Sequence, residues 1–380
     1  MSAAQATPAD TTRITLMLTG DVMTGRGVDQ IQPVPSDPTL HEEYLRDARG
    51  YLRLAEAASG PIPRRVAPTY IWGDALPALA AAAPDRRLIN LETAVTTADS
   101  PWPDKGINYR MHPANIDCIR AVAPDCCVLA NNHVLDWGRD GLLETLDTLD
   151  RAGIATAGAG HDADEAMSPA VLRRPDGGRL LVFAAGHRSS GVPDDWAAGP
   201  GRCGVHCLPD FSAGTIDRLA ERIEAARRPG DQVLLSIHWG GNWGYEIPDE
   251  HRAFAHRLID RGVVDLVHGH SSHHPRAIEV HRDRLILYGC GDLLNDYEGI
   301  RGHERYRGDL ALIYLPTLEE GRLTALRMLP FRIGRFRLNH PSADDIDWLA
   351  ATMDREAARF GGGVERKPDD TLALHWPVGS

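Results

Sequence analysis

Histidines are concentrated in one stretch of the sequence. Eight of the 17 histidines fall between His238 and His281, and several occur together in the segment His268-Gly-His270-Ser-Ser-His273-His274. Imidazole is a common metal ligand at neutral pH, and a glycine lets the backbone turn tightly around an ion. A lone histidine usually packs in a core or lies at the surface, but several around a glycine turn favour metal binding.

Carboxylate and amide side chains elsewhere complete a mixed set of candidate ligands. Asp21, Glu92 and Asn132 would supply oxygen, and His238 would supply nitrogen, without any thiolate. Such a set suits Mn, Fe, Zn or Ni and differs from that of a structural zinc site. A carboxylate can bridge two ions, and two ions about 3.5–4 Å apart can hold a hydroxide while clamping a substrate oxygen. These residue types therefore indicate a hydrolytic centre with one or two divalent transition metal ions.

Short apolar runs end abruptly in residues of these ligand types, which predicts the strands that position them. The runs are 14–19 before Asp21, 88–89 before Asn90 and Glu92, 126–130 before Asn131 to His133, 233–237 before His238, 263–267 before His268, and 285–288 shortly before Asp292. Continuous apolar runs of this length are typical of strands buried on both faces. Their polar ends would gather along one edge of a sheet.

Helical patterns alternate with these runs. They span 142–151, 216–228 and 250–261, and a last helix is predicted from Ser342 to about Phe360, with Asp345 placed for a capping box. The alternation favours an α/β fold that binds ligands at the carboxyl ends of its strands. Segments 32–70 (partly helical), 93–113 and 188–211 are predicted to be long functional loops.

Five motifs occur in the order found in a known bacterial family. They are Thr19-Gly-Asp-Val-Met-Thr-Gly-Arg26, Asn90-Leu-Glu-Thr93, Ala130-Asn-Asn-His133 followed by Asp136 and Gly141, His238-Trp-Gly240, and Gly269-His-Ser-Ser-His-His-Pro275. The series resembles the CapA family, named for poly-γ-glutamate capsule biosynthesis and similar to the calcineurin-like metallophosphoesterases. This resemblance implies a four-layer α-β-β-α sandwich over residues 13–316. Residues 1–12 are expected to be disordered, and residues 317–380 to form an extension with one helix and an irregular tail.

The resemblance also implies a metal-binding role for each matching residue. Asp21 would bind one ion, Glu92 would take the bridging position, and Asn132 would bind the second ion. The imidazole ligands would be His238, His270 and His273.

Two departures from the metallophosphoesterase pattern leave the number of ions open. Met23 stands where the superfamily has a histidine, so one ion loses a ligand, and Glu92 stands where the superfamily has a bridging aspartate. His268 and His274 remain alternative ligands, because spacing alone does not choose among the four late histidines.

Two further residues of the motifs are candidates for proton transfer. The resemblance implies that His133 protonates the leaving group or stabilises the negative charge that develops there, with Asp136 as its orienting partner.

The charge of the chain bears on its partners. With 41 Lys+Arg against 53 Asp+Glu, its formal net charge is −12, which argues against nucleic acids and anionic membranes. Arg26 beside the Asp21 turn and Arg110 in a predicted loop are placed to bind the carboxylate or phosphate of a substrate. Because the first residues lack the apolar core of a secretory signal and no run suits a membrane anchor, a cytoplasmic protein is expected. The oligomeric state stays open.

Two functions agree with these features. The first is a divalent-metal-dependent hydrolase that uses a metal-bound hydroxide to cleave a phosphoester, or a γ-glutamyl or other amide bond, of a small anionic substrate. The alternative is a non-hydrolytic component of polyglutamate or γ-glutamyl peptide biosynthesis with a vestigial metal site.

Overall fold

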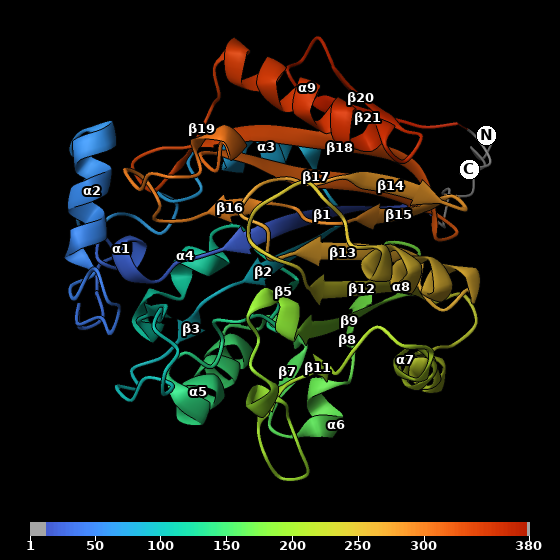
Figure 1. Cartoon of the computed structure of the whole chain (residues 1–380), viewed down its shortest axis with the longest axis horizontal. Helices are drawn as coiled ribbons and strands as arrows, with labels where there is room; N and C mark the ends of the chain where they lie inside the picture. Colours follow the sequence, from blue (N-terminus) through green and yellow to red (C-terminus); the bar gives the residue numbers. More distant parts are fainter. Residues whose placement is uncertain (1–12, 378–380) are drawn as a thin grey trace, which may run out of the picture.

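A computed structural model describes residues 13–377, in which most strands belong to two large sheets (Figure 1). The larger sheet contains β1 (Arg13–Val22), β2 (Arg86–Leu91), β5 (Cys126–Val128), β6 (Ala155–Ala157), β16 (Asp292–Leu294), β17 (Leu310–Glu319), β18 (Arg322–Ile333), β19 (Leu338–Asn339), β20 (Gly363–Arg366) and β21 (Leu372–His375). The second contains β8 (Ala170–Arg173), β9 (Arg179–His187), β11 (Cys207–Leu208), β12 (Gln232–His238), β13 (Leu266–His270), β14 (Ile278–His281) and β15 (Arg284–Leu287).

Each of the two large sheets combines parallel and antiparallel strands. The larger sheet runs β20-β21-β18-β17-β1-β2-β5-β6, with β16 beside β1 and β19 beside β18. The second runs β11-β9-β12-β13-β15-β14, with β8 beside β9. Strands β1, β2, β5 and β6 are parallel, as are β9, β12, β13 and β15. Two short pairs complete the described strands: β3 (Ala94–Val95) with β4 (Arg110–Met111), and β7 (Ala159–Gly160) with β10 (Gly204–Val205).

Helices and strands share three buried apolar clusters. The helices are α1 (Arg26–Asp29), α2 (Arg49–Ser59), α3 (Ala75–Ala82), α4 (Asp117–Arg120), α5 (Gly138–Arg151), α6 (Ala163–Ala166), α7 (Ala213–Ala226), α8 (Asp249–Asp260) and α9 (Ala343–Ala358). One cluster joins the two sheets, with Leu16 of β1 and Leu234 of β12 among its members. A second joins Met17 of β1 to α5, and a third joins β12 to α7 and α8. Because neighbouring residues of β1 enter different clusters, that strand is buried on both faces, as its continuous apolar run predicted.

The alternation of strands and helices confirms a mixed α/β fold. Strands β1, β2, β5, β12 and β15 and helices α5, α7 and α8 lie where the apolar and helical patterns predicted them. Helix α9 is also confirmed, because the Ser342 hydroxyl accepts from the Asp345 backbone N–H and the Asp345 carboxylate accepts from the Ser342 N–H. Strand β13 differs, since it starts at Leu266 and continues through His270, so His268 lies inside the strand.

The C-terminal residues differ from the predicted irregular tail. They form β20 and β21, and β21 pairs with β18 at one side of the larger sheet. Each strand has four residues, too few for a periodic pattern to stand out in the sequence. The predicted boundary near residue 316 falls inside β17, which pairs with β1. The prediction of disorder for residues 1–12 lies outside the described residues.

None of the helices between residues 13 and 377 combines the length and the apolar character that a membrane span requires.

Candidate metal centre

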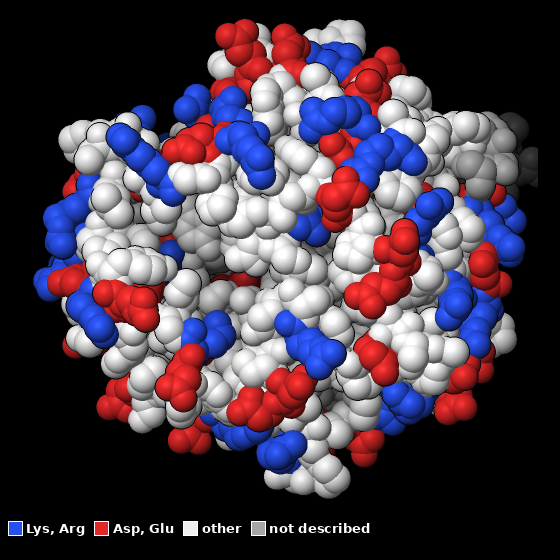
Figure 2. Space-filling view, in the orientation of Figure 1, with Lys and Arg blue, Asp and Glu red and all other residues white. Residues whose placement is uncertain are grey.

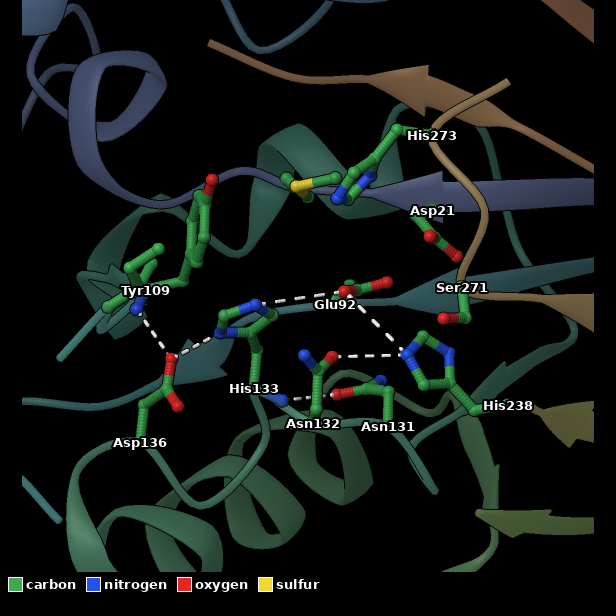
Figure 3. Close-up of polar contacts among 12 residues, drawn as sticks. Asp21, Glu92, Tyr109, Asn131, Asn132, His133, Asp136, His238, Ser271 and His273 are labelled. Atoms are coloured by element: carbon green, nitrogen blue, oxygen red, sulfur yellow. Dashed lines mark hydrogen bonds and ion pairs between the residues drawn. The ribbon is translucent and has the colours of Figure 1, made fainter. Parts of the chain in front are cut away.

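The carboxyl ends of strands from both sheets converge on one polar centre (Figure 3). Asp21 lies near the end of β1, Glu92 follows β2, and the segment 131–133 follows β5. From the second sheet, His238 ends β12 and His270 ends β13. The predicted gathering of polar strand ends is therefore present, but it joins two sheets.

Asp21 belongs to two overlapping groups of candidate ligands. One group consists of Asp21, His238 and His270, and the other of Asp21, His273 and Asp292. Within each group the candidate ligand atoms lie within 4.8 Å of one another, and all five side chains are buried. The shared carboxylate is thus Asp21, whereas the sequence predicted Glu92 for the bridging position.

Asp292 is the member of this set that the ligand assignments from sequence missed. It begins β16, which pairs in parallel with β1 so that Asp292 lies in register with Asp21. Its Oδ1 lies 2.9 Å from His273 Nδ1, and its Oδ2 accepts a hydrogen bond from Asn295. A signal was present, because an apolar run ends just before Asp292, but neither a motif nor its distance along the chain linked it to Asp21.

An amide network fixes the two carboxylates nearest the strand ends. Asn90 Nδ2 donates to Asp21 Oδ1 at 2.7 Å and to Glu92 Oε2 at 3.1 Å. Asn131 orients this amide in turn, because its Nδ2 donates to Asn90 Oδ1 at 3.0 Å. Asp21 Oδ2 is buried without a hydrogen-bond partner among the described residues. A carboxylate oxygen held in this state lacks the cation or donor that burial normally demands.

The buried carboxylates perturb one another. Burial, followed by the charge of Asp292, raises the pKa of Asp21 to about 7. Burial and the neighbouring Asp21 raise the pKa of Glu92 well above its usual range. Although burial opposes it, the Asp292 carboxylate raises the pKa of His273. Negative charge thus exceeds what the surrounding protein neutralises, which is the electrostatic condition of a cation site.

The histidines of the first group are hydrogen-bonded to each other and to Asn132. His238 Nδ1 and His270 Nδ1 lie 2.7 Å apart and share one hydrogen bond, and His238 Nε2 lies 3.0 Å from Asn132 Oδ1. Burial lowers the pKa of both imidazoles well below the usual value, so they are neutral at pH 7. Neutral imidazole is the form that binds metal ions.

The two alternative histidines are engaged elsewhere. His268 Nε2 donates to the Thr19 carbonyl at 2.8 Å, and its Nδ1 lies 3.0 Å from the Ser236 hydroxyl. His274 Nδ1 donates to the Pro275 carbonyl, and its Nε2 accepts from the Gly244 backbone N–H. Neither ring belongs to a candidate ligand group that contains Asp21, whereas His270 and His273 each do, so this geometry favours His270 and His273 as ligands.

His133 and Asp136 form a buried pair beside the carboxylates. His133 Nδ1 lies 2.6 Å from Asp136 Oδ2, and Asp136 Oδ2 also accepts from the Tyr109 backbone N–H at 2.7 Å (Figure 3). His133 Nε2 lies 3.8 Å from Glu92 Oε1. Burial, partly opposed by Asp136, lowers the pKa of His133 to about 4. With Nδ1 donating to Asp136, Nε2 of the neutral ring is a proton acceptor at pH 7.

Arg26 and Arg110, the predicted substrate contacts, have partners within the protein. The Arg26 guanidinium donates to Glu42 at 2.9 Å and to Asp296 at 2.5 and 3.1 Å, with all three side chains buried. Arg110 donates to the carbonyls of Ala98 and Asp37 and lies against the Trp137 ring. These contacts compete with any substrate anion.

Replacing Arg26 by methionine tests this structural role. Arg26→Met would leave the buried Glu42 and Asp296 carboxylates without their cation, so we expect a loss of about 3–5 kcal/mol in the free energy of unfolding. Arg49→Met is the control, because its ion pair with Asp47 is exposed and should contribute less than about 1 kcal/mol. Urea unfolding measures both. Unchanged stability of Arg26→Met would contradict the structural role.

A second test uses the raised pKa of Asp21 in the metal-free protein. Between the ordinary pKa of 3.8 and the folded value of about 7, Asp21 is protonated in the folded state but ionised in the unfolded state. Its contribution to the free energy of unfolding therefore falls as pH rises through that range. Buried histidines such as His133 act in the opposite direction. We therefore expect the stability of Asp21→Asn relative to wild type, measured by urea unfolding with chelator, to increase from about pH 5 to about pH 8. A difference independent of pH would refute the raised pKa.

A cavity of about 510 Å³ adjoins the centre at His273. Asn242, Trp243, Asn295, Tyr297 and Arg301 contribute to its wall. Trp243 stacks on His303 with ring centroids 4.0 Å apart. On the face seen in Figure 2, basic and acidic side chains are interspersed around a hollow. The cavity thus has an aromatic surface and adjoins the candidate ligand His273. Its wall also includes one cation, Arg301, and the acidic Glu304.

Comparisons with known proteins show which family the sequence resembles. Residues 15–297 match the family described as bacterial capsule synthesis protein PGA_cap. A "Probable polyglutamine synthesis accessory protein" of Mycobacterium tuberculosis (strain CDC 1551 / Oshkosh) is 48% identical over 365 residues, which cover 95% of this chain and 96% of the relative. The "Capsule biosynthesis protein CapA" of Bacillus anthracis is 23% identical, over 95% of this chain and 77% of the relative. The "PGA biosynthesis protein CapA" of Bacillus subtilis is 24% identical, over 54% and 52%.

These matches confirm the resemblance drawn from the five motifs. The family is part of the metallophosphoesterase-like superfamily, and its match includes every candidate ligand of the centre. The chain belongs to the PGA_cap (CapA) family of bacterial capsule synthesis proteins.

Proposed function

We propose that this protein is a divalent-metal-dependent hydrolase that cleaves a phosphoester, or a γ-glutamyl or other amide bond, of an anionic substrate. The proposal rests on Asp21, a buried carboxylate that is shared by two groups of candidate ligands. Its Oδ2 lacks a hydrogen-bond partner within residues 13–377, and its pKa is raised by burial and by Asp292. A protein that never bound a cation there would bear this electrostatic cost without compensation.

The donor set fits one or two ions of Mn, Fe, Zn or Ni. Asp21, His238 and His270, with Asn132 beside them, would hold one ion, and Asp21, His273 and Asp292 the other. Asp292 would thereby supply a ligand where Met23 removes one. Glu92 would take a bridging or hydrogen-bonding position next to Asp21. When bound, such ions lower the pKa of water and polarise the bond that is cleaved.

His133 and Asp136 would move the proton in this reaction. His133 Nε2 is unprotonated at pH 7 and lies on the side of the ring that faces Glu92. It would take up a proton as water attacks and return it to the leaving group. Asp136 would hold the ring through Nδ1 and stabilise the imidazolium. Lys105 Nζ, 3.3 Å from Asp136 Oδ1, would help to hold that carboxylate in place.

The cavity beside His273 would hold the substrate. Arg301 lines it together with Glu304 and would bind an anionic group, while Trp243 and Tyr297 would cover apolar parts. We also propose that the two sheets and their helices correspond to the four-layer α-β-β-α sandwich of metallophosphoesterases. In that arrangement the domain would extend past residue 316, because β18 and β21 continue the larger sheet.

The second candidate is a non-hydrolytic role in polymer synthesis. It is favoured by the name of the Mycobacterium tuberculosis relative, which describes an accessory protein of polyglutamine synthesis. In that role the metal site would be vestigial, and the cavity would bind polymer without cleaving it.

A substrate panel separates the two candidates. The metal-loaded protein, the chelated protein and Asp21→Asn are incubated with phosphomonoesters, phosphodiesters, γ-glutamyl peptides and poly-γ-glutamate, and released phosphate or amine is measured. A hydrolase cleaves at least one class only in the metal-loaded wild type. Polymer binding without cleavage of any member, or cleavage that survives chelation, would reject the proposed reaction.

A further inference from the structure

Helix α8 and strand β14 bring together four side chains that take no part in the centre described above. His256 and Asp260 are four residues apart on α8, and Glu279 and His281 are two residues apart on β14. Residues four apart share one side of a helix, and residues two apart share one face of a strand. Each element therefore presents one imidazole and one carboxylate to the same junction.

Short contacts join the two pairs. His256 Nε2 lies 2.9 Å from Glu279 Oε1, and His281 Nε2 lies 2.8 Å from Asp260 Oδ1. The two imidazole rings are stacked with centroids 3.9 Å apart and planes 3° apart. Ligand atoms of His256, Glu279 and His281 all lie within 4.8 Å of one another. Small ring movements would thus direct two nitrogens and a carboxylate oxygen toward a single point.

The surroundings orient these donors and leave them accessible. Glu279 is buried, and its Oε2 accepts from the Tyr288 hydroxyl at 2.7 Å, which fixes Oε1 toward His256. The imidazoles are partly exposed, at 20% for His256 and 22% for His281. Two arginines face the carboxylates: Arg252 lies 3.7 Å from Glu279, and Arg282 lies 2.9 Å from Asp260. Being largely exposed, both arginines can turn away into solvent when another cation arrives.

We propose that His256, Glu279, His281 and Asp260 form a second, peripheral binding site for a divalent transition metal ion. Two imidazoles and two carboxylates suit Zn²⁺, Co²⁺ or Ni²⁺. The Tyr288 hydrogen bond to Glu279 acts as the outer support that metal-binding carboxylates usually have.

Such an ion would restrain the loops of the central site. Helix α8 follows the loop that begins after His238, and β14 follows the loop that carries His273. Both loops therefore end at elements that the peripheral ion would tie together. The role is one of stabilisation and is independent of the hydrolysis proposed above.

Cobalt binding to the full chain tests the site. Metal-free wild type, His256→Ala/His281→Ala, Asp21→Asn and the combined variant are titrated with CoCl₂, and bound Co²⁺ per chain is measured by equilibrium dialysis and visible absorption. We expect the histidine double variant to bind one Co²⁺ fewer than its parent, in both the wild-type and the Asp21→Asn backgrounds. Failure of the central site would appear separately, as an unchanged stoichiometry in Asp21→Asn.

Two further variants complete the test. His161→Ala is the matched control, because His161 is paired with Glu165 four residues away but belongs to none of the candidate ligand groups among the described residues. Its stoichiometry should therefore equal that of wild type. If the double variant fails to fold, Glu279→Gln replaces it. This substitution keeps the side-chain shape and should weaken Co²⁺ binding at this site at least tenfold. Equal Co²⁺ stoichiometry and affinity in wild type and in these α8–β14 variants would overturn the proposal.

Discussion

Asp21→Asn is expected to abolish hydrolysis and to remove the metal bound at the centre. The amide keeps the size of the carboxylate and its position between the two ligand groups, but it loses the charge that both groups share. The metal would stabilise the transition state by several kcal/mol, so its loss corresponds to a fall of at least about 10³-fold in kcat. Metal content per chain and turnover of the cleaved substrate class measure the two effects.

Asp29→Asn provides a matched control for this substitution. Asp29 is also a buried carboxylate, and burial raises its pKa to about 6, but it accepts hydrogen bonds from Ser36 and His112 and belongs to neither ligand group. Its metal content should equal that of wild type. Equal metal content in Asp21→Asn and Asp29→Asn would show that Asp21 does not bind the ions.

His133→Gln is expected to lower kcat by about 10²–10⁴-fold while leaving the bound metal unchanged. The imidazole is placed to accept and return a proton at Nε2, and glutamine cannot do so. Because His133 is not a member of either ligand group, metal binding should survive. Turnover, together with metal content in the same preparation, separates proton transfer from metal binding.

The control for His133 is His206, a partly buried histidine. Burial lowers the pKa of His206 to about 4, as it does for His133, but His206 Nδ1 contacts the Ala184 carbonyl and not a carboxylate. His206→Gln should therefore retain kcat. A large loss of metal in His133→Gln, or equal losses of kcat in the two variants, would contradict the assigned proton transfer.

Apolar runs that end in polar residues predicted much of the centre, because a strand and the side chain at its end are neighbours in the sequence. An apolar run that stops at Asp21 or His238 indicates both a buried strand and a polar side chain at its end. The choice between His268 and His270 was beyond the sequence, since residues two apart on a strand face the same side. It depends on which imidazole lies near Asp21: His270 does, whereas His268 contacts the Thr19 carbonyl, 249 positions away along the chain.

The predicted roles of Arg26 and Glu92 also depended on partners that are distant in the sequence. An arginine beside a candidate ligand suggests anion binding, but Asp296, which pairs with Arg26, is 270 residues away. Glu92 matched the bridging position of the motif, whereas the pairing of β16 with β1 puts Asp292 beside Asp21. Long-range strand pairing of this kind leaves no periodic signal in the sequence.

The most direct test of the central claim is a metal titration of turnover in the His256→Ala/His281→Ala background, where the peripheral site is absent. Metal-free protein receives increasing Mn²⁺ or Zn²⁺, and hydrolysis of the substrate panel is followed. We expect activity to be absent without metal, to rise with added ion and to saturate at one or two equivalents per chain. Activity that is already complete in metal-free protein, or ions that bind at the centre without hydrolysis of any substrate class, would contradict the central claim.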